Sequence, residues 1–579
     1  MKRHPLSQRH VRGMIKLSVL LAVAVTLAGA LQATGRLGVA PEGEPAHLVA
    51  PAELRPLADK YELDEEARQR LQRAYEALEA HEAKPKPDPV ETNGPIFTDW
   101  PVPQAALVIT GEQVGYLEPC GCAGLENQKG GLKRRHSMVK VLRDQWKWPL
   151  VMMDAGEQVR YVGPQAEIKY RYSIESLMEI GYHAVGFGPK DLRTDLLGLV
   201  INLPPDQTPL TSASIGVLGF DPDFSKRLRV VTVGEGAQAV RVAITHVMGP
   251  QALAETAPSD DLDKLSPNEA LAAVLPEIAA AKADQNVLMV YGDRSEAEAI
   301  AREHDVFDWV VAGRGSDEPP STARRIEGSR RGGGAMLVEV GHKGMYAVVV
   351  GLYRDQAAAA EGALKPGQGW LARYQKVPLD HRWADSPEMH AKLVAYQQEL
   401  ATLRWEGLGL KPRRHPTNEE FAGSAVCADC HTAAWEVFEK TPHFWTTETL
   451  VALNPARHLD PECISCHAVG WEPQKYYPFA SGWVSHAATP HLSGNGCENC
   501  HGPAARHAAV ELGDLDVDEA EETALRQALH LEVQENEGNM PGQVLGKAVD
   551  NCLQCHDLDN SPDFDFQEYW PVVKHEGMD

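Results

Sequence analysis

The stretch "FAGSAVCADCHTAAW" (residues 421–435) holds two cysteines three positions apart, with a histidine directly after the second. A single unit of this kind is compatible with a zinc clip, a redox-active thiol pair or a haem attachment site. The same Cys-x-x-Cys-His unit recurs three more times before the end of the chain. The four copies are CADCH (427–431), CISCH (463–467), CENCH (497–501) and CLQCH (552–556).

Haem attachment explains every position of this unit. Two thiols add to the two vinyl groups of a porphyrin as thioethers, and the adjacent imidazole binds the iron as an axial ligand. Zinc binding and thiol exchange give no reason for a histidine after each of four cysteine pairs. We therefore predict four c-type haems. The predicted thioether residues are Cys427, Cys430, Cys463, Cys466, Cys497, Cys500, Cys552 and Cys555, and the predicted proximal iron ligands are His431, His467, His501 and His556.

The segment that carries these units, 416–579, lacks strand periodicity and is dense in Gly, Pro, His and Cys. Covalently bound cofactors can replace a large apolar core, as other staples do in small domains. We therefore expect a mainly α, loop-rich multihaem domain. Eight further histidines are candidates for the second axial positions: His415, His443, His458, His486, His491, His507, His530 and His575.

Four longer stretches around the units are "GSAVCADCHTAAWEVFEKTPHFWT", "PECISCHAVGW", "GCENCHGPAARH" and "CLQCHDLDNSPDFDFQEYWPVVKH". Together they resemble the tetrahaem cytochrome c554 family over roughly the last 160 residues. The resemblance implies distal axial ligands at His443 after "TP", at His507 after "CHG", and at His575 at the end of the "YW" segment. The family also includes a haem with an open axial position, and the spacing does not show which haem that is here. Haems with two histidine ligands transfer electrons, whereas an open haem binds small ligands.

The N-terminus has the pattern of a secretory signal over residues 1–33. Basic residues precede an apolar run over 17–31, and Ala28-Gly29-Ala30 is similar to a cleavage site. The run is shorter than the roughly 20 residues of a membrane span, and an uncleaved N-terminal membrane anchor is the alternative. Both interpretations predict an exported, periplasmic protein, in the compartment where c-type haem is attached. The net charge of −25 argues against nucleic acid as a partner and suits a redox partner protein with a basic surface.

Three further segments precede the haem domain. Residues 34–96 are rich in Pro, Ala and Glu and predict a spacer with a helix over 64–83. Residues 97–384 alternate apolar strand-like runs with helical stretches, which is typical of an α/β domain. Residues 385–415 predict a connecting helix. The predicted strands are 105–110, 149–156, 183–188, 240–247, 286–292, 307–313, 335–340 and 346–353, and the predicted helices are 131–145, 170–181, 268–283 and 295–304.

The blocks "TGEQVG" (110–115), "GGLKRR" (130–135), "DAGE" (154–157), "GFGPKDL" (186–192) and "AGRGSD" (312–317) resemble the periplasmic 5'-nucleotidase type of calcineurin-like metallophosphoesterase. The resemblance implies a four-layer α/β sandwich. Two divalent metals need several N and O ligands, and most of the ligand positions of the family hold other residues here. We therefore predict that the dimetal site is lost, with a hydrolase using altered ligands as an alternative. The replaced positions are Glu112, Val114, Glu157, Pro189, Lys190, Arg314 and Ser316.

Cys120 and Cys122, one residue apart in the loop after the first strand, are candidate catalytic residues. Such a pair binds a metal or takes part in thiol chemistry, and a structural disulfide or inert thiols are the alternative. Lys129 and the basic run 133–135 would lower a thiol pKa if they lie close in space. The leading hypothesis is electron transfer through four haems. The rival hypothesis is a redox enzyme that acts on a small nitrogen or sulfur compound at an open haem or at this cysteine pair.

Overall fold

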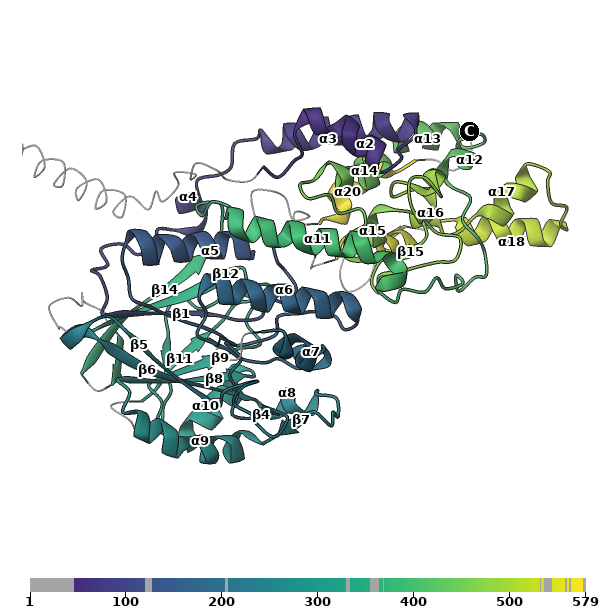
Figure 1. Cartoon of the computed structure of the whole chain (residues 1–579). Helices are drawn as coiled ribbons and strands as arrows, with labels where there is room; N and C mark the ends of the chain where they lie inside the picture. Colours follow the sequence, from purple (N-terminus) through teal and green to yellow (C-terminus); the bar gives the residue numbers. More distant parts are fainter. Residues whose placement is uncertain are drawn as a thin grey trace, which may run out of the picture. The chain divides into compact units, whose positions relative to one another are not determined.

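The computed structural model describes residues 46–119, 128–203, 207–329, 334–354, 364–367, 369–531, 533–535, 544–557, 560–561 and 564–575. These residues form two compact units (Figure 1). Within the described ranges, the first unit comprises 87–119 and 129–389, and the second comprises 46–86 and 390–575. No helix among the described residues is long and apolar enough to cross a membrane. The predicted signal over 1–33 lies outside the described residues.

The first unit is built on two six-stranded sheets. The first sheet has the order β13-β14-β12-β1-β2-β3, in which β1 is parallel to β2 and antiparallel to β12. The second has the order β10-β11-β9-β8-β6-β5, in which β6, β8, β9 and β11 are parallel. The strands are β1 (Ala105–Thr110), β2 (Leu150–Asp154), β3 (Ala184–Val185), β5 (Leu228–Val233), β6 (Val240–Met248), β8 (Gln285–Tyr291), β9 (Trp309–Ala312), β10 (Arg324–Arg325), β11 (Met336–Glu339), β12 (Tyr346–Tyr353), β13 (Leu364–Gly367) and β14 (Trp370–Pro378), with a separate ribbon of β4 (Ile215–Val217) and β7 (Leu262–Lys264).

The two sheets pack face to face, and helices cover their outer faces. Leu107 and Ile109 of β1 share one core with Ile244 and Met289 of the second sheet. Val108, which points to the opposite face of β1, joins a core with the helices. This α/β/β/α order confirms the predicted four-layer sandwich. The covering helices are α5 (Leu132–Lys140) and α6 (Pro164–Ile180) on the first sheet, and α9 (Pro267–Ala281) and α10 (Arg294–Glu303) on the second.

Shorter helices complete the first unit, and its last residues begin α11 (Pro387–Gly407), which continues into the second unit. The backbone of α11 is non-helical at Arg404. Trp405, near its C-terminal end, packs in a core of the second unit with Trp471 and Trp483. The shorter helices are α4 (Pro89–Asn93), the π-helical turn η3 (Val141–Gln145), η4 (Asp191–Arg193), α7 (Leu196–Ile201), η5 (Gly236–Gln238) and α8 (Pro250–Ala254).

The second unit is mainly helical, as predicted, and its β-structure is confined to two short ribbons among the described residues. The helices are η1 (Pro51–Glu53), α2 (Leu54–Lys60), α3 (Glu65–Glu82), α12 (Ser424–Ala428), α13 (Thr432–Phe438), η7 (Pro442–Trp445), α14 (Thr446–Ala452), α15 (Pro461–His467), η8 (Pro490–Leu492), α16 (Cys497–His501), α17 (Ala505–Glu511), α18 (Glu519–Leu529), α19 (Lys547–Cys552) and α20 (Phe566–Val573); the ribbons are β15 (Trp471–Glu472) with β16 (Tyr477–Pro478), and β17 (Gln534–Glu535) with β18 (Val544–Leu545).

The structure differs from the predicted spacer over 34–96. Helix α3 is present, but its apolar side chains do not face solvent. Leu71 and Tyr75 share a buried core with Val451 and Ala452 of α14. An amphipathic helix buries its apolar stripe against a partner, and that partner lies far away in sequence. Residues 46–86 therefore belong to the second unit, which also contains the four Cys-x-x-Cys-His units.

Candidate haem-binding site

The four Cys-x-x-Cys-His units lie on short helical turns of the second unit. The amide of His431 donates to the carbonyl of Cys427 at 2.9 Å, and the amide of His556 donates to the carbonyl of Cys552 at 2.9 Å. Residues four apart on a helical turn project from the same face. Each turn therefore presents its first thiol and its imidazole to the same side, as attachment to one porphyrin requires.

Cysteines of different units lie close to one another. Cys427 of the first unit lies beside Cys497 of the third, and Cys466 of the second lies beside Cys555 of the fourth. The side-chain amide of Asn551, beside the fourth unit, donates to a carbonyl of the third. The four attachment points therefore share one neighbourhood.

Two proximal histidines have a defined tautomer. His467 Nδ1 lies 2.8 Å from the carbonyl oxygen of Thr446, and His501 Nδ1 lies 2.7 Å from that of Leu529. A carbonyl only accepts, so Nδ1 carries the hydrogen and Nε2 keeps its lone pair. This arrangement orients a metal-binding imidazole and raises its basicity. Burial lowers the pKa of both rings, which favours the neutral form that a metal requires.

Histidines from outside the units lie opposite two of the proximal ones. The ring centres of His443 and His556 are 6.1 Å apart, and those of His501 and His575 are 6.0 Å apart. Two imidazoles on opposite sides of one metal ion, each with a nitrogen about 2 Å from it, have ring centres about 6 Å apart. His575 Nδ1 also donates to a carbonyl, that of Val573 at 2.8 Å, so its Nε2 keeps the lone pair.

The third predicted distal histidine, His507, lies on α17. Its Nδ1 is 3.6 Å from Glu511 Oε1. Burial lowers the pKa of His507, Glu511 opposes this shift, and the nearby charge of His431 lowers the pKa further. The structure thus brings His507 into the electrostatic neighbourhood of the first unit's proximal histidine.

The donor set fits the two protein ligands that a haem iron takes. Among the described residues, which include every histidine and cysteine from 416 to 575, no three or more His, Cys, Asp or Glu side chains are arranged to hold a metal ion. A structural zinc site needs four such ligands. Haem iron takes only two axial ligands from the protein, and paired imidazoles 6 Å apart supply them.

Sequence reasoning missed the groups that support these units. Glu498, between the cysteines of the third unit, is buried, and its carboxylate accepts from the amides of Ala422, Gly423 and Ala504 at 2.8–3.1 Å. It thereby fixes the chain that leads into the first unit. In the sequence, Glu498 occupies one of the two positions of the Cys-x-x-Cys-His unit at which any residue is allowed, so its role could not be predicted. The carbonyl acceptors at Thr446 and Leu529 have no sequence signal at all.

Residues 426–502, which span the first three units, match the family model described as "Cytochrome c554 and c-prime". The second unit contains a cytochrome c554 domain. The curated cytochrome c-554 of Nitrosomonas europaea is 32% identical over 96 residues, which cover 14% of this chain and 38% of that protein. The chain thus spans well under half the length of this relative. The cytochrome c554 family implies covalently bound haem.

Several solved structures are similar to the chain. They include a 5'-nucleotidase precursor from Thermus thermophilus (TM-score 0.41, 18% identity, covering 52% of this chain and 59% of that one) and the sulfate thiohydrolase SoxB from the same organism (TM-score 0.41, 12% identity, 52% and 62%). A third is the calcineurin-like phosphoesterase YfkN from Bacillus subtilis (TM-score 0.36, 12% identity, 51% and 97%). The four-layer assignment rests on the strand order and core packing described above.

Two acidic residues at replaced metal-ligand positions in the first unit contact nitrogen-bearing side chains. Lys190 Nζ lies 3.5 Å from Glu157 Oε1, and the Lys190 amide donates to Glu157 Oε2 at 3.1 Å. Burial raises the pKa of Glu157 to about 7, against the opposing charge of Lys190. Glu112 pairs with His342 Nδ1 at 3.0 Å. A lysine and a histidine thus lie beside two of the carboxylates, and the loss of the dimetal site stays a prediction.

Cys120 and Cys122 lie outside the described residues. The cations expected to act on them are engaged with other groups. Lys133 Nζ lies 2.7 Å from Asp385 and 3.4 Å from Glu118, and Arg135 lies 3.6 Å from Asp154. These contacts hold the start of α5 to the end of β2 and to the segment before α11. These ion pairs of Lys133 and Arg135 therefore have a structural role.

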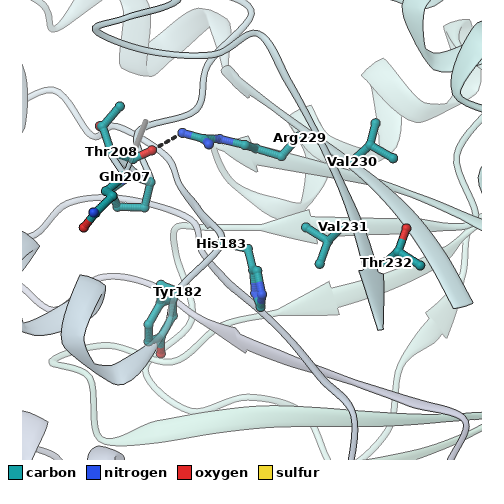
Figure 2. Close-up of a pocket in the computed structure, with 9 residues that line it drawn as sticks. Tyr182, His183, Gln207, Thr208, Arg229, Val230, Val231 and Thr232 are labelled. Carbon is teal, nitrogen blue, oxygen red and sulfur yellow. Dashed lines mark hydrogen bonds between the residues drawn. The ribbon is translucent and has the colours of Figure 1, made fainter. Parts of the chain in front are cut away.

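An open pocket of about 460 Å³ lies in the first unit, beside the start of β3 and along β5 (Figure 2). Arg229 of β5 reaches across it and donates to the carbonyl of Thr208. The Met152 amide donates to Nδ1 of His183, another lining residue, at 3.1 Å. These polar groups are used to join the loop to the sheet. The pocket contains none of the site residues predicted from the sequence.

Proposed function

We propose that the chain is an exported multihaem c-type cytochrome that transfers electrons through four covalently attached haems. Each Cys-x-x-Cys-His unit supplies two thioether bonds and one proximal iron ligand. The observation that carries the proposal is the placement of His443 and His575. Each comes from outside the units, and each lies 6.0–6.1 Å, ring centre to ring centre, from a proximal histidine.

The ring distances support two axial pairs, and electrostatic proximity supports a third. His443 pairs with His556, and His575 pairs with His501. His507 is assigned to the haem of the first unit because it lies in the field of His431. The three distal ligands implied by the family resemblance are therefore assigned to three different haems.

Electron transfer follows from the ligand arrangement. Bound haem iron would supply one-electron redox chemistry, and two histidines at each of three haems would leave no position there for a substrate. The chain's own residues do the rest. The carbonyls of Thr446 and Leu529 hold two proximal rings in one tautomer and orientation. Cys427 lies beside Cys497, so the haems of these two units would be attached close together, which would favour transfer between them.

Export is part of the proposal. It is supported by the signal-like pattern over 1–33 and by the attachment of c-type haem outside the cytoplasm. Retention of the apolar run as an anchor would place the same protein at the membrane surface. Size and N-terminal sequence of the protein isolated from membrane and soluble fractions distinguish the two forms.

Spectroscopy of the full-length holoprotein tests the proposal. The protein is produced in a host that attaches c-type haem, and low-spin and high-spin haems are counted by electron paramagnetic resonance. The variants His443→Ala and His575→Ala should each convert one low-spin haem to high spin. His81→Ala, which removes a histidine of the same unit that is not among the candidate axial ligands, should leave the spectrum unchanged. Unchanged spectra in both distal variants would refute the assigned pairs, and a protein without haem would refute the function.

A further inference from the structure

The helical hairpin formed by α17 and α18, joined by residues 512–518, extends from the second unit (Figure 1). Two cross-links hold its helices together. Arg526 of α18 binds Glu511 of α17 through two contacts, at 2.7 and 2.9 Å, and Arg506 of α17 pairs with Glu521 of α18. The hairpin is thus a preformed element.

The loop of this hairpin presents apolar side chains to solvent. Leu512 is 51% exposed and Leu515 is 38% exposed. The loop is ordered by backbone bonds, since the amide of Leu515 and the amide of Asp514 both donate to the carbonyl of Ala509. Exposed apolar side chains surrounded by polar residues are typical of a protein-binding surface.

The residues around the two leucines define the charge of the partner. Between 505 and 529 the chain has seven acidic residues and two basic ones. Both arginines are already paired with glutamates of the hairpin, so the remaining acidic side chains give the surface a negative potential. A complementary partner carries positive charge. The acidic residues are Glu511, Asp514, Asp516, Asp518, Glu519, Glu521 and Glu522.

The hairpin is also connected directly to haem ligands. His507, the distal ligand assigned to the first unit's haem, lies on α17. At the other end, the carbonyl of Leu529, the last residue of α18, accepts from Nδ1 of the proximal ligand His501 at 2.7 Å. Leu512 follows His507 by five residues, which is about 7.5 Å along an α-helix. A protein bound at the loop would therefore lie one short helix away from a haem ligand.

We propose that the α17–α18 hairpin is the docking surface for a small, positively charged one-electron redox protein. The proposal rests on the proposed haem function. When electrons leave, one ferrous haem iron of this chain becomes ferric, and the oxidised metal centre of the partner gains that electron. When electrons enter, the same exchange runs in reverse. No bond breaks and no proton moves.

Stopped-flow kinetics with a basic monohaem cytochrome c as the probe tests this surface. The full-length holoprotein is reduced and mixed with the oxidised probe over a range of ionic strengths. The variant Asp514→Asn/Asp516→Asn/Glu519→Gln should lower the second-order rate constant about tenfold at low salt, because steering by opposite charges is lost. Its rate should also depend less on salt. The control Glu235→Gln/Asp260→Asn/Asp261→Asn removes the same charge from the surface of the first unit and should retain the wild-type rate.

A second variant distinguishes the contribution of apolar contact from that of long-range electrostatic attraction. Leu512→Ser/Leu515→Ser should lower the rate at high salt, where long-range attraction is screened, and should keep the wild-type salt dependence. Equal rates for the wild type and the acidic variant would overturn the proposal, as would equally fast reaction with an acidic flavodoxin. Dithionite-reduced spectra recorded first separate the two hypotheses. Missing haems count against the proposed function, whereas four haems with unchanged rates count against the docking surface alone.

Discussion

Replacement of Arg70 tests the finding that the N-terminal segment belongs to the haem unit. Arg70 of α3 is 6% exposed, and its Nε lies 3.1 Å from Oε1 of Glu448, which is fully buried. In Arg70→Met, the Glu448 carboxylate loses the guanidinium and keeps the imidazole of His486, whose Nε2 lies 3.3 Å from Oε1. Removing one partner of a buried ion pair costs about 3–5 kcal/mol, since the remaining charge is uncompensated.

For a unit of this size, each kcal/mol shifts the melting temperature by about 2–4 °C. Arg70→Met should therefore lower the melting temperature of the second unit by about 10 °C, measured by haem absorbance on heating. Arg68→Met is the matched control. Arg68 lies on the same helix and pairs with Asp59 at 2.8 Å, but this pair is largely exposed, and such pairs contribute less than about 1 kcal/mol.

The double variant Arg70→Met/Glu448→Gln completes the test. It removes both charges, so its melting temperature should lie above that of Arg70→Met alone. If the stability of Arg70→Met lies within about 1 kcal/mol of that of Arg68→Met, α3 does not bury this pair against α14, and residues 46–86 do not belong to the unit.

Three further predictions concern the first unit. Burial raises the pKa of Glu157 to about 7, so its contribution to folding is fully present below about pH 4.5 and is lost as the pH rises through 7. The free energy of unfolding, measured with denaturant, should decrease by about 3 kcal/mol over this range, and Glu157→Gln should remove the decrease. A variant with the wild-type pH profile would contradict this prediction. Gly186→Ala would place Cβ 2.3 Å from Cδ2 of the buried His246 and should cost about 1–3 kcal/mol; a variant as stable as the wild type would refute this packing. Added Mn²⁺ should leave the unfolding temperature of the first unit unchanged, and a rise with Mn²⁺ concentration would show that a metal site persists.

The first unit was largely predictable because its strands are buried on both faces. Runs such as "AALVIT" and "YAVVVGLY" read as strands from composition alone and coincide with β1 and β12. Several strands were missed, and the two longest of them, β5 and β14, are different. β5 is an edge strand with alternating exposure, and β14 carries Arg373 and Lys376 among its apolar residues. Their short apolar stretches do not stand out from the loops.

The haem units were predictable because their chemistry is local to five residues. The contacts that complete the site are not local. Arg70 and Glu448 are 378 positions apart, and the pattern of α3 shows an apolar stripe without showing what covers it. Likewise, the sequence does not distinguish axial ligands from other histidines among the twelve from His415 onward. Only the tertiary structure places His443 opposite His556.

Covalent haem attachment is best examined by intact mass spectrometry of the full-length protein, purified from cells that mature c-type cytochromes. We expect a polypeptide heavier by four haem groups that remain attached after denaturation, because thioether bonds survive unfolding. A mass equal to the polypeptide alone, or a coloured group that separates on denaturation, would contradict covalent attachment at the four units.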